Sequence, residues 1–364
     1  MRVLAIDVGT GTQDILLFDT EREPENCLKM VMPSPTVMVA ERIRQATARG
    51  AALLLTGVTM GGGPCAWAAK AHIEAGHPVY ATPDAARTFN DDLDEVARMG
   101  VQVVSEDEAA GLQSVERITM RDFDIEAIRQ ALAIFGVGGR FDLLAIAVFD
   151  HGNAPPGYSD RQFRFDYLTE RLATRNHLAS FAFWRQDIPP IMTRLLAVSR
   201  TAPADMPLFV MDTAPAAVLG ALEDPHVGAV ARSVAVNVGN FHTLAFRLGN
   251  GRIEGIFEHH TGLLTRDKLD ALLTQLAEGT LDHAALFADH GHGALMFDRQ
   301  PVPLDFLAVT GPRRSLLTGS RYKPYMAVPY GDMMMTGCWG MVRALAESWP
   351  ERQEEIEAAL SRGS

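Results

Sequence analysis

The chain has 364 residues, of which 47% are hydrophobic and 21% charged, a composition typical of a globular protein long enough for two domains. Its formal net charge is −12 and its basic residues are scattered, which argues against nucleic acid as a partner, because binding to backbone phosphates requires a basic patch. No apolar stretch approaches the roughly 18 residues that span a bilayer, so we expect no membrane segment.

The cysteines and the first residues point to a cytoplasmic protein. Cys27, Cys65 and Cys338 are odd in number and far apart, which excludes a disulfide framework and every Cys-x-x-Cys metal or iron–sulfur spacing. The chain enters an apolar run at once, without the basic region and apolar core of a secretory signal, so we expect the mature protein to start near Met1.

The first nineteen residues predict a strand, a glycine turn and a second strand. Apolar runs at 2–7 and 12–19 flank Val8-Gly9-Thr10-Gly11-Thr12. Such a hairpin turns amides and hydroxyls outward, as a phosphate-binding turn requires, and Asp7 beside it can hold a hydrated cation. Ordinary tight turns also favour Gly-Thr, and Asp7 is then a turn-stabilising residue. A Rossmann turn is not indicated, because Asp14 stands where its third glycine belongs and the strand continues.

The rest of the first half alternates helices with strands. We expect strands at 27–32, 51–56, 78–82, 101–105 and 141–150, and helices at 36–49, 64–75, 90–99 and 122–135. A glycine-containing loop follows at 151–157. An all-helical segment, broken at Pro189-Pro190, then extends from 162 to about 199, and we expect it to cover a cleft.

The second half repeats the first. Residues 233–246 again place an apolar run before a polar residue, a glycine, a polar turn, a threonine and another apolar run, with Asn237 in the position of Asp7. We expect strands at 208–212, 233–238, 242–248, 252–258 and 304–309, helices at 214–222, 266–277, near 313 and at 332–349, and a helical turn at 282–287. No low-complexity linker separates the halves, so a cleft between two closely packed domains is expected.

These motifs resemble those of the superfamily of actin, sugar and acetate kinases and heat-shock chaperone ATPases. Residues 7–12 and 237–243 are similar to its two phosphate motifs. Residues 212–220 and 337–341 are similar to its interdomain connecting helices, and residues 307–312 to its adenosine motif. The resemblance covers about 1–150 and 205–345.

The resemblance implies an α/β fold in which two actin-like ATPase (ribonuclease H-like) domains of βββαβαβα type flank a nucleotide cleft, with a helical insertion. We expect an N-terminal domain over 1–155, the insertion over 156–204 and a C-terminal domain with connecting helices over 205–364. The implied ligands are ATP and Mg²⁺, with Asp7 as the magnesium ligand. The residues implied to bind the nucleotide are Gly9, Thr10, Gly11, Thr12, Asn237, Gly239, Asn240, Thr243, Thr310, Gly311 and Arg313.

Two departures from this pattern favour nucleotide binding over hydrolysis. Asn237 stands where the second phosphate motif usually carries Asp, and an amide can neither accept a proton nor bring negative charge to Mg²⁺. The usual double glycine of the adenosine motif is Gly311-Pro312. The resemblance implies a kinase or an ATPase acting on an unidentified small metabolite.

More narrowly, the chain resembles an uncharacterised family labelled "putative pyruvate formate-lyase activating enzyme". A radical enzyme of that kind requires three closely spaced cysteines, which this chain lacks. The label suggests an alternative function, a nucleotide-dependent activator or chaperone-like partner of a metabolic enzyme. In that case the protein would bind a client enzyme and not a small-molecule substrate. A homodimer is compatible with either function.

Four further groups of residues are candidates for chemistry. Asp150 and His151 end a buried strand where sugar kinases of the superfamily place the catalytic base, and the alternative is an Asx turn. Gly61, Gly62 and Gly63 precede a helix and could approach the substrate, a phosphate or only a neighbouring loop.

The histidines of 258–262 and 289–293 could ligate a transition metal, which would make the protein a metal-dependent enzyme, or lie in the cleft or on the surface without a metal. The arginines at 313–314 could contact a base or phosphate, or be solvated, and the methionines at 333–335 are expected in the core.

Overall fold

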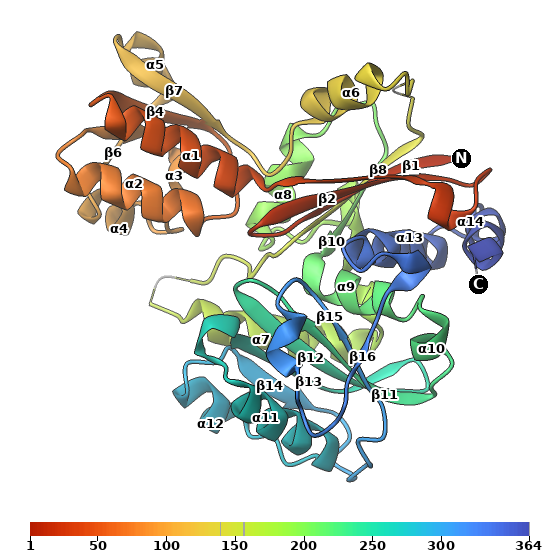
Figure 1. The fold of residues 1–364 in the computed structure, drawn as a ribbon. Coiled ribbons are helices and arrows are strands. Elements are labelled where there is room, and N and C mark those ends of the chain that lie inside the picture. The colour runs from red at the N-terminus through yellow and green to blue at the C-terminus, as the bar shows by residue number, and fades with distance from the viewer. Residues whose placement is uncertain (139, 156, 364) are drawn as a thin grey trace.

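The computed structural model describes residues 1–138, 140–155 and 157–363. Each half is built on a six-stranded mixed sheet with the same core order (Figure 1). Three strands form an antiparallel meander, and two further strands add in parallel on the other side of the first. The first sheet runs β3 (Leu28–Pro33), β2 (Thr12–Asp19), β1 (Arg2–Val8), β8 (Leu143–Val148), β10 (Leu208–Asp212) and β9 (Ala182–Trp184).

The second sheet runs β14 (Gly293–Met296), β13 (Arg252–His260), β12 (His242–Gly249), β11 (Arg232–Val238), β15 (Leu307–Thr310) and β16 (Tyr325–Met326). The expected α/β fold with a repeated βββ unit is therefore confirmed. The repeat extends to single atoms, because Gly9 N donates to Thr12 O at 2.9 Å in the first hairpin and Gly239 N donates to His242 O at 3.0 Å in the second.

A separate lobe lies between β3 and β8, at the upper left of Figure 1. It contains α1 (Pro35–Ala48), β4 (Ala52–Gly57), α2 (Pro64–Glu74), β5 (Val79–Ala81), α3 (Pro83–Ala86), α4 (Leu93–Arg98), β6 (Val101–Val103), α5 (Glu106–Gly111) and β7 (Val115–Met120). Its strands form their own parallel sheet, in the order β6-β5-β4-β7, and do not extend the first sheet. The strand at 115–120 was missed, because Glu116, Arg117 and Thr119 leave it neither a continuous apolar run nor a strict alternation of apolar and polar residues.

The sequence predicts an all-helical segment between β8 and β10, and this prediction is wrong. The segment contains α7 (Asp160–Thr174) and α8 (Thr193–Thr201), but β9 lies between them and pairs antiparallel with β10. Three residues are too short to give a periodic strand pattern, so only the pairing partner reveals β9. The preceding helix α6 (Ile125–Ile134) begins after Asp124, which caps it by accepting from the amides of Glu126 and Ala127.

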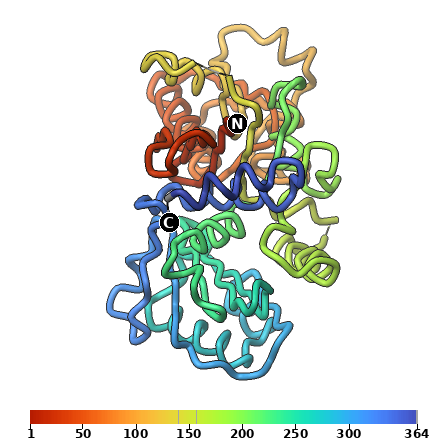
Figure 2. The backbone as a smooth tube through the Cα atoms, turned by 90° about the vertical axis from the view of Figure 1, so that its right-hand side faces the viewer, coloured from red at the N-terminus to blue at the C-terminus, as the bar shows by residue number. Residues whose placement is uncertain are grey.

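Two helices pass between the halves, α9 (Thr213–Ala221) and α13 (Thr336–Ser348), as Figure 2 shows for α13. They cross where Gly220 faces the backbone of Thr336 and Gly340 faces that of Ala216, so closely that a Cβ on either glycine would overlap the opposing carbonyl oxygen. The remaining helices are α10 (Pro225–Gly228), α11 (Arg266–Glu278), α12 (His283–Ala288) and α14 (Gln353–Leu360). Among the described residues, no helix has the length and apolar character needed to cross a bilayer.

Candidate functional site

A cavity of about 1310 Å³ lies where both hairpin turns and the separate lobe meet. Most residues implied for the nucleotide line it, namely Gly9, Thr10, Thr12, Asn237, Gly239, Asn240, Thr310 and Gly311. Asp7, Asp150, His151 and the glycines at 61–63 line it as well. The described lining leaves out Gly11, Thr243 and Arg313. Thr243 is buried and pairs with Thr261 at 2.9 Å, and Arg313 is exposed.

The two hairpin turns touch each other at this cavity. A Cβ on Gly11 would lie 2.7 Å from Nδ2 of Asn240, so a larger residue there would displace the Asn240 side chain. Gly311 has a φ of +97°, and a Cβ there would lie 2.5 Å from Oδ1 of Asn237. Three segments far apart in the sequence thus converge, with the glycines at 11 and 311 lying against the side-chain amides of Asn240 and Asn237.

Two buried aspartates face each other across β1 and β2. Asp7 and Asp14 are paired in register, and Thr213 Oγ1 donates to Asp7 Oδ1 at 2.6 Å. Burial raises the pKa of Asp7 to about 6, the Thr213 hydrogen bond opposing the shift and Asp212 adding to it. Burial, together with Asp7, raises the pKa of Asp14 to about 8. Asp14 was not predicted as a site residue, although hairpin pairing places it opposite Asp7.

Asp150 is 4% exposed and both of its carboxylate oxygens accept backbone hydrogen bonds. Gly152 N donates to Oδ1 and Leu195 N donates to Oδ2, each at 2.9 Å. His151 places Nδ1 2.8 Å from the carbonyl oxygen of Gly152. This is the geometry of the Asx-turn alternative, and the role of Asp150 and His151 in proton transfer stays a prediction.

The glycine loop at 61–63 follows the carboxyl end of β4, the edge at which parallel sheets bind ligands. Asp122 Oδ1 accepts from Gly61 N at 3.0 Å. Arg194 donates two hydrogen bonds of 2.8 Å to the same carboxylate and lines the cavity. Gly63 has a φ of +65°, and a Cβ there would lie 2.5 Å from the ring of Phe241. The sequence pattern gave no sign of Arg194, whose partners lie far away along the chain.

A buried arginine on α7 joins the two halves. Arg164 Nε donates to Glu258 Oε2 at 2.6 Å, and its Nη1 donates at 2.8 Å to Asp212 Oδ2 and to the carbonyl oxygen of Asp150. Burial alone would lower the pKa of Arg164, but Asp212 and Glu258 together raise it, so it stays charged. Burial alone would raise the pKa of Glu258, yet Arg164 and neighbouring histidines hold it well below its usual range.

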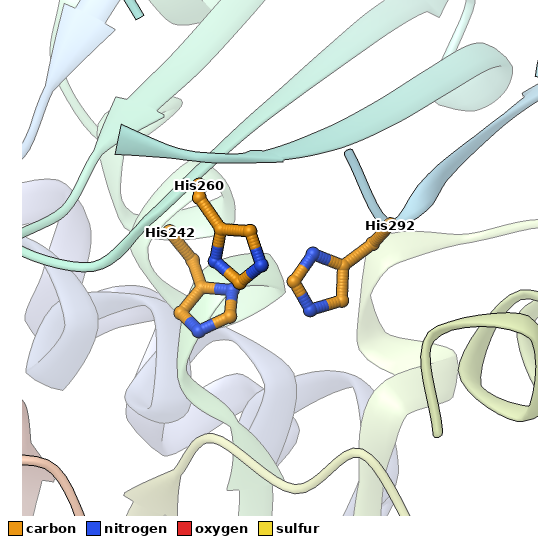
Figure 3. A group of neighbouring side chains, drawn as sticks. All are labelled: His242, His260 and His292. Carbon is orange, nitrogen blue, oxygen red and sulfur yellow. The ribbon is translucent and has the colours of Figure 1, made fainter. Parts of the chain in front are cut away.

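The histidine loops meet near Glu258, the partner of this arginine, and Figure 3 shows three imidazoles facing one another. His260 and His292 converge with His242, and one ring nitrogen from each lies within 4.8 Å of the others. Burial lowers the pKa of His292 to about 3, Glu258 opposing the shift and the other two imidazoles adding to it. Of the other histidines in these loops, His259 is buried 3.1 Å from two backbone oxygens, and His290 is exposed.

His242 was assigned to a phosphate turn and not recognised as a possible metal ligand. A signal was present, because the β12–β13 hairpin pairs His242 directly with His260. The methionine run also differs from expectation: Met335 is buried, but Met333 and Met334 line the cavity.

A family profile described as "Putative pyruvate format-lyase activating enzyme (DUF1786)" matches residues 60–316. No curated protein matches the chain significantly. Among solved structures, the ethanolamine utilization protein EutJ from Carboxydothermus hydrogenoformans is 12% identical, with a TM-score of 0.34 and coverage of 95% of this chain and 89% of that one. The ROK hexokinase from Thermus thermophilus is 12% identical, with a TM-score of 0.30 and coverage of 96% and 100%. Apo psk41 parM protein is 11% identical, with a TM-score of 0.31 and coverage of 97% and 99%.

Proposed function

The chain belongs to the family described as "Putative pyruvate format-lyase activating enzyme (DUF1786)", and we propose that it binds ATP with Mg²⁺ in the cavity and transfers the terminal phosphoryl group to a small metabolite or to water. The observation that carries this proposal is the meeting of two equivalent hairpin turns at one cavity. The first turn offers backbone N–H groups and the hydroxyls of Thr10 and Thr12, and the second offers backbone N–H groups and the side-chain amide of Asn240, which are groups that can cradle phosphates.

The paired aspartates fit a divalent cation. Asp7 and Asp14 are two carboxyls in a buried place, and Asp14 Oδ1 has no hydrogen-bond partner among the described residues. Their raised pKa values mean that the surrounding protein does not compensate two negative charges. Asp7 would hold Mg²⁺ through water, and the ion, when bound, neutralises phosphate charge.

An acceptor would enter over the glycine loop at 61–63. The loop faces the hairpin turns, and Arg194 lies against Gly61, where a Cβ would be 2.6 Å from Nη2. An acceptor hydroxyl here would need a base. Asp150 could act as one only by releasing one of its two backbone hydrogen bonds.

A second function, nucleotide-dependent activation of a metabolic enzyme by this protein as its partner, is favoured by that constraint. Asp150 is engaged by amides and Asn237 brings no charge, so binding of nucleotide without rapid transfer suits the site. The family description also names an activating enzyme. Activation would not use an iron–sulfur cluster, because the three cysteines are buried on separate parts of the fold.

We expect ATP or ADP with Mg²⁺ to raise the thermal unfolding temperature of the purified protein. A ligand that binds only the native state at 100 times its Kd adds about 2.7 kcal/mol to the free energy of unfolding. Asp7→Asn should raise the Kd for Mg²⁺-nucleotide at least tenfold and reduce the stabilisation accordingly, because it removes one of the two paired carboxylates of the first hairpin. Asp267→Asn, on a side chain 82% exposed, is the matched control.

Calorimetry that detects no binding at millimolar nucleotide would refute the proposal. The two functions are separated by ADP release in the presence of either a small-molecule library or candidate client enzymes. Stimulation by a metabolite supports the phosphotransferase. Stimulation by a protein alone supports the partner function.

A further inference from the structure

Three imidazoles from three strand ends face one another beside the nucleotide cavity (Figure 3). His242 begins β12, His260 ends β13 and His292 immediately precedes β14. The ring centroids lie 5.3 Å apart for His242 and His260, 4.8 Å for His242 and His292, and 4.6 Å for His260 and His292. The ends of three neighbouring strands therefore hold all three rings, and no loop movement is needed to bring the rings together.

Among the described residues, one buried ring nitrogen of the cluster, His292 Nδ1, makes no hydrogen bond, and Glu258 Oε1 lies 3.7 Å from it. His292 as a whole is 5% exposed. A buried polar atom without a hydrogen bond destabilises the folded state, and a bound ion is one arrangement that would satisfy it.

The surroundings hold the rings in place as supporting residues do in metal sites. Glu258 is fully buried and forms an ion pair with Arg164, so its Oε1 accepts a hydrogen bond from His242 Nδ1, at 2.9 Å. That bond leaves the second nitrogen of His242 with its lone pair. Arg164 fixes the other oxygen of Glu258 at 2.6 Å. A carboxylate behind a histidine is the usual arrangement that orients a metal ligand.

A further arginine holds the loop that carries His292. Arg161 Nη1 donates to the carbonyl oxygens of Phe287 and Gly291, at 3.2 Å and 2.6 Å. Gly293 has a φ of +151°, and a Cβ there would lie 2.6 Å from the ring of His283. The loop is thus pinned on both sides of His292.

We propose that His242, His260 and His292 bind one divalent first-row transition metal ion, with Glu258 as a positioning residue and with at least one coordination position left for water or a substrate group. Nitrogen ligands select ions such as Zn²⁺ or Fe²⁺ over Mg²⁺, which prefers oxygen. Three protein ligands are typical of catalytic zinc sites, where the ion acts as a Lewis acid on the fourth ligand. Because His242 lines the cavity, that position is near the proposed phosphate site.

The test uses full-length protein stripped with a chelator and titrated with Co²⁺, followed by absorption, and with Zn²⁺, followed by calorimetry. We expect one equivalent to bind, with visible Co²⁺ bands of a site with fewer than six ligands. His242→Gln and His260→Gln should each weaken binding by more than about 100-fold, since even supporting residues contribute roughly 10–100-fold. Glu258→Gln should weaken it less and alter the Co²⁺ spectrum.

His290→Asn is the matched control, because it removes an exposed imidazole two residues from His292 and asparagine tolerates the φ of +64° found there. Circular dichroism verifies that each variant is folded, and His242, whose side chain is 22% exposed, is the safest to replace. Failure of the wild type to bind Zn²⁺ stoichiometrically would overturn the proposal, as would equal loss in His290→Asn. Nucleotide binding is scored separately on the same proteins, so either proposal can fail alone.

Discussion

Asn237 holds, in the second hairpin, the place that Asp7 holds in the first. It lines the cavity, and its Oδ1 lies close to the Cα of Gly311. We expect Asn237→Asp to preserve or raise the rate of ATP hydrolysis, because a carboxylate there can orient water or contact Mg²⁺. Phosphate release measured beside Asn250→Asp, in the distant β12–β13 turn, provides the comparison. A large loss of hydrolysis with unchanged ATP affinity would contradict this role.

Asp14 should make stability depend on pH. An acid whose pKa rises from 3.8 to about 8 on folding is protonated in the native state and ionised in the unfolded state between those values. Stability is then highest below pH 3.8 and falls as pH rises toward 8, by up to about 1.4 kcal/mol per pH unit. Asp14→Asn should remove most of this slope.

The measurement is denaturant unfolding from pH 5 to pH 8 without Mg²⁺ or nucleotide. The variant should exceed the wild type most at pH 8, and Asp267→Asn should follow the wild type throughout. Asp7 and Asp14 titrate as a pair, so the loss of one also lowers the pKa of the other. Parallel curves for Asp14→Asn and the wild type would show that Asp14 is ionised in the folded protein.

The crossing of α9 and α13 should tolerate no side chain at its centre. Gly220→Ala forces the helices apart, because the new Cβ overlaps the carbonyl oxygen of Thr336. Overpacking of this kind costs about 3 kcal/mol. Gly111→Ala is the matched control, since Gly111 is also helical but has no atom within 4 Å of its Cβ position, and it should stabilise by about 0.5–1 kcal/mol. Equal unfolding midpoints for the two variants would refute the tight crossing.

Elements with a local signature were predictable from the sequence. The hairpins at β1–β2 and β11–β12 carry apolar runs around glycine turns, and α9 follows an Asp that caps it. The pairing of short apolar strands was not predictable, because β4, β5 and β6 resemble strands of the first sheet in every local respect. Only tertiary contacts assign them to a separate lobe.

The candidate site divides in the same way. The glycine turns and Asp7 could be found because their residues are neighbours in the sequence. Arg164 could not, because its carboxylate partners are 48 and 94 residues away. The sequence places His260 and His292 in two separate loops, a pattern that is not specific for a metal site. Only the folded sheet brings both of them together with His242 in one cluster.

At the scale of the molecule, the cavity has walls from the separate lobe as well as from both halves. The lobe reaches the second half through Trp67 on α2, whose ring centroid lies 5.3 Å from that of Phe241 in the second hairpin turn. This contact lies next to the proposed phosphate site, because Phe241 is between Asn240 and His242.

The Trp67–Phe241 contact gives the protein a built-in optical reporter. Of the four tryptophans, Trp67 is 62% exposed, whereas Trp339 is fully buried and Trp184 and Trp349 are partly buried. A movement of the lobe away from the second hairpin would free the indole of Trp67 and leave the other three in place. Changes in emission wavelength and in quenching by acrylamide would therefore follow the opening and closing of the cavity in solution without any attached dye.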